Sequence, residues 1–343
     1  MPHDAKNDRN GFTVMMAQHV VFDELGGPEV LRIEDVELGA PGPGEVLLRV
    51  DALGLNRAEA LFRSGGYYYQ ATLPGSRIGY EAAGEVLAVG AGVTGFSVGD
   101  PVLTAGAGDM SAHGVYGDHL RISADSLLRR PGGTDATTGA ALWLSYSTAY
   151  GALVEKGGLR PGDTVLITAA SSSVGVAAIQ IARHLGAIPV AVTRSAAKRE
   201  RLAQLGAAQV IALDEGGLLD QVAEVTGGRG AEIVFDPVSG PGLAEVARAV
   251  APGGLLIVYG WLDPRPTPLP LNWTLRILGY GNLQVAGDPE VRRRIWHFLD
   301  AGLRAGTLDP VIDRTFAFEE IVEAHRHLES NSQIGKIVVT VRH

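Results

Sequence analysis

One stretch of the chain, residues 163–187, limits the possible folds more than any other. It begins with a short apolar run rich in β-branched residues, Thr164–Thr168, which predicts a fully buried strand. Small residues follow, and then apolar residues recur at helical spacing as far as Leu185, with Gly186 where a helix commonly ends. A strand, a tight turn and a helix in this order build the phosphate-holding unit of a dinucleotide fold, because small side chains let backbone N–H groups approach a pyrophosphate.

The glycine fingerprint of such a unit is degraded in this chain. Ala170 and Ser172 stand at the first two glycine positions of the G-x-G-x-x-G pattern that ends at Gly175. Taken alone, the stretch therefore leaves two interpretations open: a phosphate-binding turn, or an ordinary strand–helix unit with a small-residue turn. The flanking sequence favours the first, because strand-like and helical segments keep alternating as far as Tyr259, which indicates a doubly wound parallel sheet.

Basic residues follow the next predicted strand. Where an NAD-specific fold places a carboxylate that binds the ribose hydroxyls, this chain has Thr193 and Arg194, with Lys198 one helical turn further. Arg and Lys neutralise a 2′-phosphate, which a carboxylate would repel. The alternative is a solvated basic start of a helix. The position at the end of the second strand favours NADPH as the cofactor.

Length and composition exclude several classes of function. The 343 residues suffice for two domains, and the net charge of −9 argues against nucleic acid as the main partner. The sequence contains no cysteine, so disulfides and thiolate metal sites are excluded. No apolar run reaches the ~20 residues that span a bilayer. We expect residues 1–16 to be a flexible leader without the apolar core of a secretory signal, and the protein to be cytoplasmic.

The chain divides near residue 136. From Gln18 to about Arg130, short strand-like runs are separated by Gly and Pro turns, as in an irregular barrel. The predicted fold class is therefore α/β. A barrel-like domain is expected from residues 17–136 and 286–343, and a dinucleotide-binding domain from residues 137–285.

Several short motifs occur in a fixed order along the chain: GLNRAE at 54–59, GYEAAGEV at 79–86, GFSVGD at 95–100, STAY at 147–150, DPV at 236–238 and GKIVV at 335–339. In these motifs and their order the sequence resembles the medium-chain dehydrogenase/reductase superfamily, specifically its zinc-free quinone oxidoreductase (zeta-crystallin-like) branch. The resemblance implies a GroES-like β-barrel catalytic domain, a Rossmann NADPH-binding domain and an active site in the cleft between them.

This chain differs from the zinc-dependent members of the superfamily at the positions of their metal ligands. Those members place a Cys where Asn56 stands, a His where Tyr80 stands, and a Cys or similar ligand near Leu144. Of that neighbourhood only Glu81 is a zinc donor. His113 and His119 lie near one another in sequence but have no further partner at a recognisable spacing, so we expect no metal.

The resemblance also implies a reaction, in which NADPH reduces a quinone or a related activated carbonyl without zinc. Asn56 and Tyr146 are the candidate catalytic residues, as hydrogen-bond donors to the charge that develops on oxygen. Tyr67 and Tyr80 are candidate side chains of the substrate cleft. Two alternatives remain open at this point: reduction of an enone or enoyl double bond, and NADPH binding without catalysis.

The expected cofactor contacts follow the carboxyl ends of the strands and the C-terminal segment. They comprise Ser172, Ser173, Val174 and Gly175 at the pyrophosphate, Thr193, Arg194 and Lys198 at the 2′-phosphate, Val238 and Gly260 at later strand ends, and Asn331 and Lys336 in the segment that returns to the cleft. An apolar segment at 275–280 resembles the edge strand through which members of the family form homodimers. The resemblance therefore implies that this chain forms a homodimer.

The expected zinc independence can be tested by chelation. Without cysteine, the thiolates that zinc-dependent members use cannot form. Reductase activity should therefore survive exhaustive chelation, and elemental analysis should find less than one zinc per chain. Loss of activity on chelation and its recovery with zinc would contradict the prediction.

Overall fold

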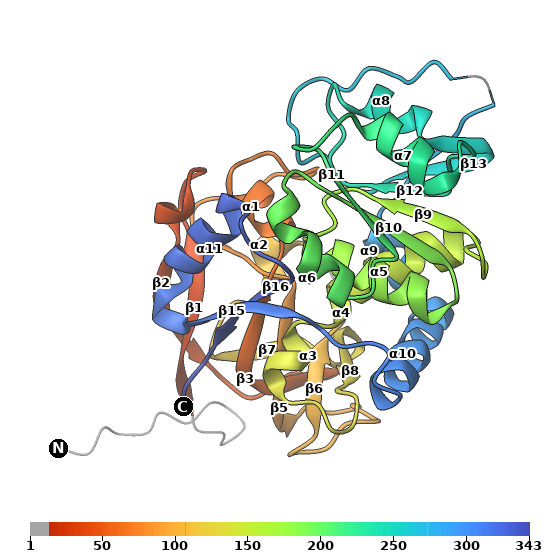
Figure 1. The fold of residues 1–343 in the computed structure, drawn as a ribbon. Coiled ribbons are helices and arrows are strands. Elements are labelled where there is room, and N and C mark those ends of the chain that lie inside the picture. The colour runs from red at the N-terminus through yellow and green to blue at the C-terminus, as the bar shows by residue number, and fades with distance from the viewer. Residues whose placement is uncertain (1–13, 107, 273) are drawn as a thin grey trace. The chain divides into compact units, whose positions relative to one another are not determined.

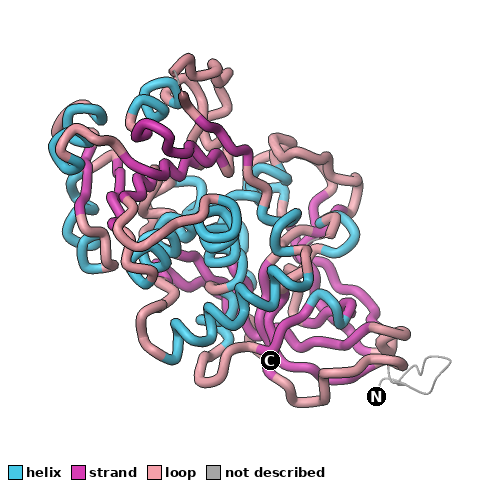
Figure 2. Tube along the Cα trace, turned by 90° about the vertical axis from the view of Figure 1, so that its right-hand side faces the viewer, coloured by secondary structure: helices cyan, strands magenta, loops and turns pink. Residues whose placement is uncertain are grey.

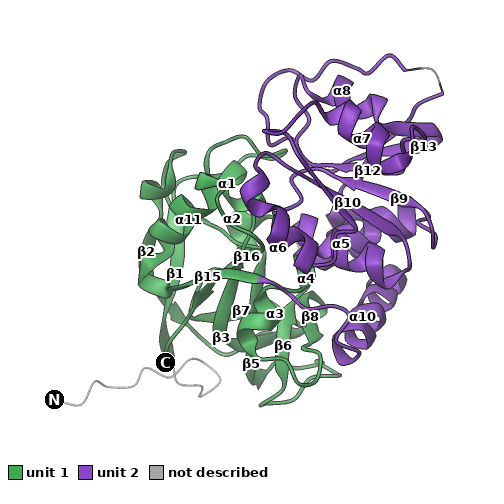
Figure 3. Cartoon of the chain, in the orientation of Figure 1, with its two compact units in different colours: residues 1–144, 312–343 green, residues 145–311 purple. Residues whose placement is uncertain are grey.

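The computed structural model describes residues 14–106, 108–272 and 274–343. The chain divides into two compact units, Met1–Leu144 with Ile312–His343 (unit 1) and Ser145–Val311 (unit 2), as Figure 3 shows. Colouring by secondary structure shows that strands predominate around the C-terminus, which belongs to unit 1, whereas strands and helices alternate in unit 2 (Figure 2).

Unit 2 is a parallel sheet with helical connections (Figure 1). Among the described residues, six strands pair in parallel in the order β11-β10-β9-β12-β13-β14. Numbered from β9, this is the order 3-2-1-4-5-6 of a dinucleotide-binding sheet, so the predicted doubly wound fold is confirmed. The strands are β9 (Thr164–Ile167), β10 (Ile188–Thr193), β11 (Gln209–Ala212), β12 (Ala231–Asp236), β13 (Val250–Val258) and β14 (Arg276–Gly279).

The α-helices of unit 2 come before, between and after these strands in the sequence. They are α4 (Trp143–Tyr150, which starts at the unit boundary), α5 (Ser173–His184), α6 (Arg199–Gln204), α7 (Leu218–Thr226), α8 (Leu243–Arg248), α9 (Asn282–Ala286) and α10 (Pro289–Arg304). Alternate strand residues such as Val190 and Val192 pack with Leu218 of α7 and Leu243 of α8 in one buried cluster. The period of two follows from the pleat of the strands.

The opening unit β9–turn–α5 has the local structure that its residues predict. Every residue of β9 is buried. Ser172 is the N-cap of α5, and its Oγ accepts from the backbone N–H of Gly175 at 3.1 Å. A Cβ at Gly175 would lie 2.6 Å from the carbonyl oxygen of Ala170, so only glycine fits where the helix approaches the turn.

Unit 1 contains two sheets. In the described residues, one has the order β15-β16-β3-β5-β6-β8 with β7 also paired to β3, and the other has the order β2-β1-β4. The strands are β1 (Met15–Phe22), β2 (Arg32–Leu38), β3 (Glu45–Leu55), β4 (Ser76–Arg77), β5 (Glu81–Val89), β6 (Pro101–Thr104), β7 (His119–Ser123), β8 (Leu127–Arg129), β15 (Ile312–Ala317) and β16 (Lys336–Thr340). The helices are α1 (Arg57–Arg63), α2 (Met110–His113), α3 (Ala136–Ala140) and α11 (Ile321–Ser330).

Strand β16 lies between β15, to which it is parallel, and β3, to which it is antiparallel. Strand β16 therefore has an interior position in this sheet of unit 1, although it follows all of unit 2 in the sequence. Across the described residues, no helix combines the length and the apolar character needed to cross a lipid bilayer.

The expected leader and unit boundaries differ from the structure. Residues 1–13 of the expected leader lie outside the described residues, whereas Met15 and Met16 belong to β1, because they pair in register with Leu38 and Glu37 of β2. The compact units divide after residues 144 and 311, and the expected boundaries were at 136 and 285. Helix α10 belongs to unit 2, where the guanidinium of Arg294 binds Glu155 through two hydrogen bonds.

Gly79 precedes the start of β5 and allows the chain to pass close to a buried ring. Its φ is +103°, and an added Cβ would lie 2.1 Å from Cδ1 of Tyr116. Gly79→Ala should lower the free energy of unfolding by roughly 2–5 kcal/mol, because backbone strain and overpacking add. Gly99 is the matched control, since its φ is +88° and nothing lies within 4 Å of its added Cβ. Gly99→Ala should cost about 1–2 kcal/mol, and equal losses in chemical denaturation of the two variants would contradict the steric argument.

Candidate active site

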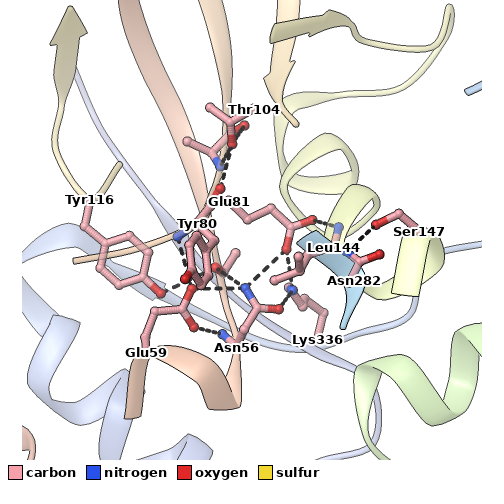
Figure 4. Close-up of polar contacts among 12 residues, drawn as sticks. Asn56, Glu59, Tyr80, Glu81, Thr104, Tyr116, Leu144, Ser147, Asn282 and Lys336 are labelled. Carbon is pink, nitrogen blue, oxygen red and sulfur yellow. Dashed lines mark hydrogen bonds and ion pairs between the residues drawn. The ribbon is translucent and has the colours of Figure 1, made fainter. Parts of the chain in front are cut away.

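The residues predicted from the sequence fall into two groups, one in each unit. In unit 1, Asn56 follows β3, Tyr80 and Glu81 stand at the start of β5, and Lys336 begins β16. These strands are neighbours in one sheet, so their ends bring the side chains together (Figure 4). With Glu59 of α1 these side chains form a buried polar cluster, which we call the Asn56 cluster.

An ion pair lies at the centre of the Asn56 cluster. The ammonium of Lys336 donates to Oε2 of Glu81, and each side chain is 1% exposed. Both ends have further partners: Nζ of Lys336 also donates to Oδ1 of Asn56, and Oε1 of Glu81 accepts from the N–H of Leu144 at 2.9 Å. A buried ion pair is tolerated only when its remaining hydrogen-bonding capacity is met in this way.

The amide of Asn56 points into this cluster. Its NH₂ group lies 3.2 Å from Oε1 of Glu59, 3.3 Å from the carbonyl oxygen of Gly54 and 3.4 Å from Oε2 of Glu81. Both amide protons therefore have acceptors within unit 1, and the oxygen is bound by Lys336. The arrangement favours a positioning role, and the catalytic role of Asn56 stays a prediction.

Glu59 is a fully buried carboxyl held by three N–H groups. Its Oε2 accepts from the backbone N–H of Asn56 at 2.7 Å, and its Oε1 accepts from the N–H of Tyr80 at 3.1 Å and from the Asn56 amide. Burial raises the pKa of Glu59 to about 7, although the Lys336 ammonium and these donors act in the opposite direction. A carboxyl with this pKa exchanges a proton near neutral pH.

Three phenol groups adjoin the cluster through Tyr80. The hydroxyl of Tyr80 lies 2.7 Å from that of Tyr69 and 3.3 Å from that of Tyr67. Tyr80 is 5% exposed, while Tyr67 and Tyr69 are partly buried. The structure thus brings the two predicted cleft residues, Tyr67 and Tyr80, into one hydrogen-bonded group.

Tyr146, the second predicted catalytic residue, is buried in unit 2. Its hydroxyl donates to Oε1 of Gln180 at 2.7 Å, and Gln180 also binds the backbone of Asp309 through both of its side-chain groups. Burial raises the pKa of Tyr146 well above its usual value. These contacts favour a structural role in tying α4 to α5, and the catalytic role stays a prediction.

The predicted pyrophosphate residues form the N-cap and the first turn of α5. Ser172, Ser173 and Val174 are partly buried, and Gly175 is buried. The ammonium of Lys198 donates to the hydroxyl of Ser171 at 3.0 Å, which places this cation beside the same turn. Backbone N–H groups at a helix N-terminus together with an ammonium suit an anionic phosphate.

The other predicted cofactor residues of unit 2 lie at the carboxyl ends of adjacent strands. Thr193 is buried at the end of β10, and Arg194 is exposed directly after it. Val238 follows β12, where the carboxylate of Asp236 accepts from the N–H groups of Val238 and Ser239. Gly260 follows β13, and its carbonyl accepts from the hydroxyl of Ser239 at 2.7 Å. This edge of a parallel sheet is where dinucleotides bind, so the residues present fit a nicotinamide dinucleotide.

The two predicted residues of the C-terminal segment differ in exposure. Asn331 is exposed at the end of α11, where its Oδ1 accepts from the guanidinium of Arg57. Lys336 is buried in the Asn56 cluster, with Asn56 and Glu81 as its partners. These contacts tie both residues to unit 1, and their cofactor roles stay predictions.

The prediction from sequence gave no role to Glu59. A signal for Glu59 was present, because a Glu three residues after an Asn at a helix start is one half of a capping box. The contact between the hydroxyls of Tyr69 and Tyr80 had no comparable signal, since it depends on how the segments that carry them pack together. In the described ranges, no three His, Asp or Glu side chains meet in an arrangement that could hold a metal ion.

Known proteins resemble this chain over nearly its whole length. A model for the "Alcohol dehydrogenase GroES-like domain" matches residues 42–132, and a model for "Zinc-binding dehydrogenase" matches residues 173–294. The chain is 33% identical over 333 residues to a quinone oxidoreductase of Pseudomonas aeruginosa, with 94% of this chain and 99% of that protein covered. It is 30% identical over 340 residues to a 2-haloacrylate reductase of a Burkholderia species, with coverage of 94% and 99%. The crystal structure of Escherichia coli quinone oxidoreductase complexed with NADPH superposes with a TM-score of 0.85 at 25% identity, covering 94% of this chain and 99% of that one.

The raised pKa of Glu59 predicts a pH dependence of stability. Between the ordinary pKa of about 4.5 and the folded value of about 7, the folded chain binds more protons at Glu59 than the unfolded chain does. The contribution of Glu59 to the free energy of unfolding should therefore be present below about pH 4.5 and be lost as the pH rises to 7.

The measurement compares chemical denaturation of the wild type and of Glu59→Gln at several pH values. The difference in the free energy of unfolding between the two proteins should change by about 3 kcal/mol from pH 4.5 to 7, which corresponds to the shift in the pKa of Glu59. A difference that is constant from pH 4.5 to 7.5 would show that the folded pKa of Glu59 is not raised.

Proposed function

Because this chain belongs to the quinone oxidoreductase branch of the medium-chain dehydrogenase/reductase superfamily, we propose that it reduces quinones or related activated carbonyl compounds with NADPH and without zinc. The donor set around Asn56 supports this reaction most directly. The two positions at which zinc-dependent members have Cys and His carry an amide and a phenol, and an ammonium lies against the amide. An ammonium repels a dication, whereas these groups suit an acceptor that gains negative charge.

NADPH supplies a hydride when it is bound, and the protein supplies binding, orientation and electrostatics. The turn before α5, with Ser172, would hold the pyrophosphate, and Arg194 and Lys198 would face the 2′-phosphate. An acceptor that is already electron-poor needs less electrophilic assistance than a carbonyl that is reduced to an alcohol. The residues of unit 1 would orient the acceptor and supply its proton.

A second candidate activity is the reduction of an activated carbon–carbon double bond. The relative named 2-haloacrylate reductase favours it, because haloacrylate is an alkene conjugated to a carboxylate. Hydride addition to such an alkene and to a quinone builds negative charge on a conjugated oxygen in both cases, so the same donors serve either acceptor.

The test measures NADPH oxidation with a panel of quinones, enones and 2-haloacrylate. It also measures NADP⁺ reduction with simple alcohols. The proposal expects turnover with quinones or enones and none with alcohols. Turnover confined to 2-haloacrylate and enones would select the second activity. Tight NADPH binding without turnover on any acceptor would instead favour a binding protein.

NADPH should be preferred to NADH because of Arg194. Loss of one charge-assisted phosphate contact costs on the order of 1.5–3 kcal/mol. Arg194→Ala should therefore raise KM for NADPH by roughly tenfold or more and leave KM for NADH nearly unchanged. Arg201→Ala is the matched control, because Arg201 is an exposed arginine of α6 that contacts Gln204, and this variant should leave both constants unchanged. Equal effects of Arg194→Ala on the two cofactors would refute the assignment.

We also propose a homodimer formed through β14. This strand is the edge of the sheet in unit 2, it pairs with β13 on one side, and Ile277 within it is 42% exposed. An exposed edge strand with apolar side chains is an aggregation risk, which pairing with a second copy removes.

The cytoplasmic location expected from the sequence stays a prediction.

A further inference from the structure

Strands β10 and β11 bring two loops together at the carboxyl edge of the sheet in unit 2. Thr193, at the end of β10, is in register with Ala212 at the end of β11. The N–H of Leu213 then donates to the carbonyl of Thr193 at 3.0 Å. The loop that starts with Arg194 and the residues after Leu213 therefore begin side by side, and Asp214 is the first charged residue after β11.

The carboxylate of Asp214 is bound to the backbone of the loop after β10. Its Oδ1 and Oδ2 accept from the N–H of Ala196 at 2.9 Å and 3.2 Å. In the sequence, Ala196 stands between the two basic residues proposed for the 2′-phosphate, two positions after Arg194 and two before Lys198. The hydrogen bonds to Ala196 therefore hold a negative charge within the segment that is proposed to bind an anion.

The N–H groups on either side of Ala196 have neutral partners within the loop. The N–H of Ser195 donates to Oγ1 of Thr193 at 3.4 Å, and the N–H of Ala197 donates to Oγ of Ser195 at 3.3 Å. Of these three N–H groups, that of Ala196 alone binds a charged group, and this group comes from the end of another strand. Asp214 is therefore placed by the pairing of β10 and β11 and not by the local conformation of the loop.

We propose that Asp214 is a specificity-determining residue that weakens the preference for NADPH over NADH. A backbone N–H beside two cations suits a phosphate oxygen, but the N–H of Ala196 is occupied by a carboxylate of the chain itself. That carboxylate also repels a 2′-phosphate bound by Arg194 and Lys198. The inference rests on the proposed function for the place of the 2′-phosphate, and on the hydrogen bonds of unit 2 for the place of the carboxylate.

The charge of Asp214 acts on the two cofactors differently. The pyrophosphate is common to NADPH and NADH, so any repulsion of it cancels in the ratio of their affinities. Only NADPH carries the additional 2′-phosphate. Asp214 is exposed, so water and salt screen its charge, and the effect on NADPH should be moderate and should fall as the salt concentration rises. The neighbouring Glu215 differs, because it forms an ion pair with Arg199.

A structural role of Asp214 can be separated from this electrostatic role by substitution. Asp214→Asn keeps an oxygen that accepts from the N–H of Ala196 but removes the charge. Asp163→Asn is the matched control. Its carboxylate also accepts from a backbone N–H, that of Arg160 at 2.8 Å, but Asp163 precedes β9 and so lies at the opposite edge of the sheet.

The first test measures binding of two nucleotide fragments by calorimetry. The probes are 2′,5′-ADP, which carries the 2′-phosphate, and 5′-AMP, which lacks it. Asp214→Asn should tighten the binding of 2′,5′-ADP about three- to tenfold at low salt and leave that of 5′-AMP nearly unchanged. The gain should disappear at ~1 M NaCl, where the Debye length is about 3 Å. Asp163→Asn should change neither affinity. An Asp214→Asn protein that binds 2′,5′-ADP no more tightly than the wild type, or that gains equally for both probes, would overturn the inference.

The second test measures Kd for NADPH and NADH by the fluorescence of the reduced nicotinamide. The ratio of Kd for NADH to Kd for NADPH should rise about three- to tenfold in Asp214→Asn. Asp214→Ser, which removes the charge with a different side chain, should shift the ratio in the same direction. A ratio that falls in Arg194→Ala but stays constant in both Asp214 variants would overturn this inference and leave the proposed function intact. No effect of Arg194→Ala or of either Asp214 variant would place the 2′-phosphate elsewhere and overturn both.

Discussion

The buried ion pair between Lys336 and Glu81 is the interaction on which the arrangement of unit 1 depends. Removing two charges from water costs several kcal/mol for each ion, so the pair persists only with good geometry and further partners. Here Asn56 and the N–H of Leu144 supply those partners. Because Lys336 begins β16, Glu81 begins β5 and Asn56 follows β3, the pair fixes the ends of three neighbouring strands at one point.

The other groups of this site are tied to that point. Glu59 holds the N–H groups of Asn56 and Tyr80, so the start of α1 and the start of β5 share one carboxyl. Tyr80 continues the connection to the phenols of Tyr67 and Tyr69. The ion pair, the carboxyl of Glu59 and the three phenols thus form one connected hydrogen-bond network. A change at any of these groups alters the surroundings of the others.

Much of the fold could be predicted from the sequence, because its signals are local. The buried run of β9, the spacing of α5 and the alternation that follows them indicated the parallel sheet. Strands β4 (Ser76–Arg77) and β8 (Leu127–Arg129) were not predicted, because two or three residues carry no measurable periodicity. Met15 and Met16 were assigned to the leader, since only pairing with β2 makes them a strand.

The candidate site was predicted less completely, for a physical reason. Residue types and their family positions pointed to Asn56, Tyr67, Tyr80 and Lys336, but they did not indicate the direction of each polar group. Whether the Asn56 amide faces a ligand or two carboxylates depends on side chains that lie up to 280 residues away in sequence. Such long-range contacts exist only once the sheet of unit 1 has formed.

The place of β16 has a consequence for the order in which the protein forms during synthesis. Unit 2 is one continuous segment, so it can fold as soon as it leaves the ribosome. Unit 1 begins earlier on the chain but lacks the strand between β15 and β3 until residues 336–340 emerge. Unit 1, whose first strands are synthesised before unit 2, must therefore complete its fold after unit 2. Until then the inner edge of β3 offers unpaired backbone groups to any other chain, and a ribosome that stalls after unit 2 would release a protein with a formed dinucleotide domain and an open sheet.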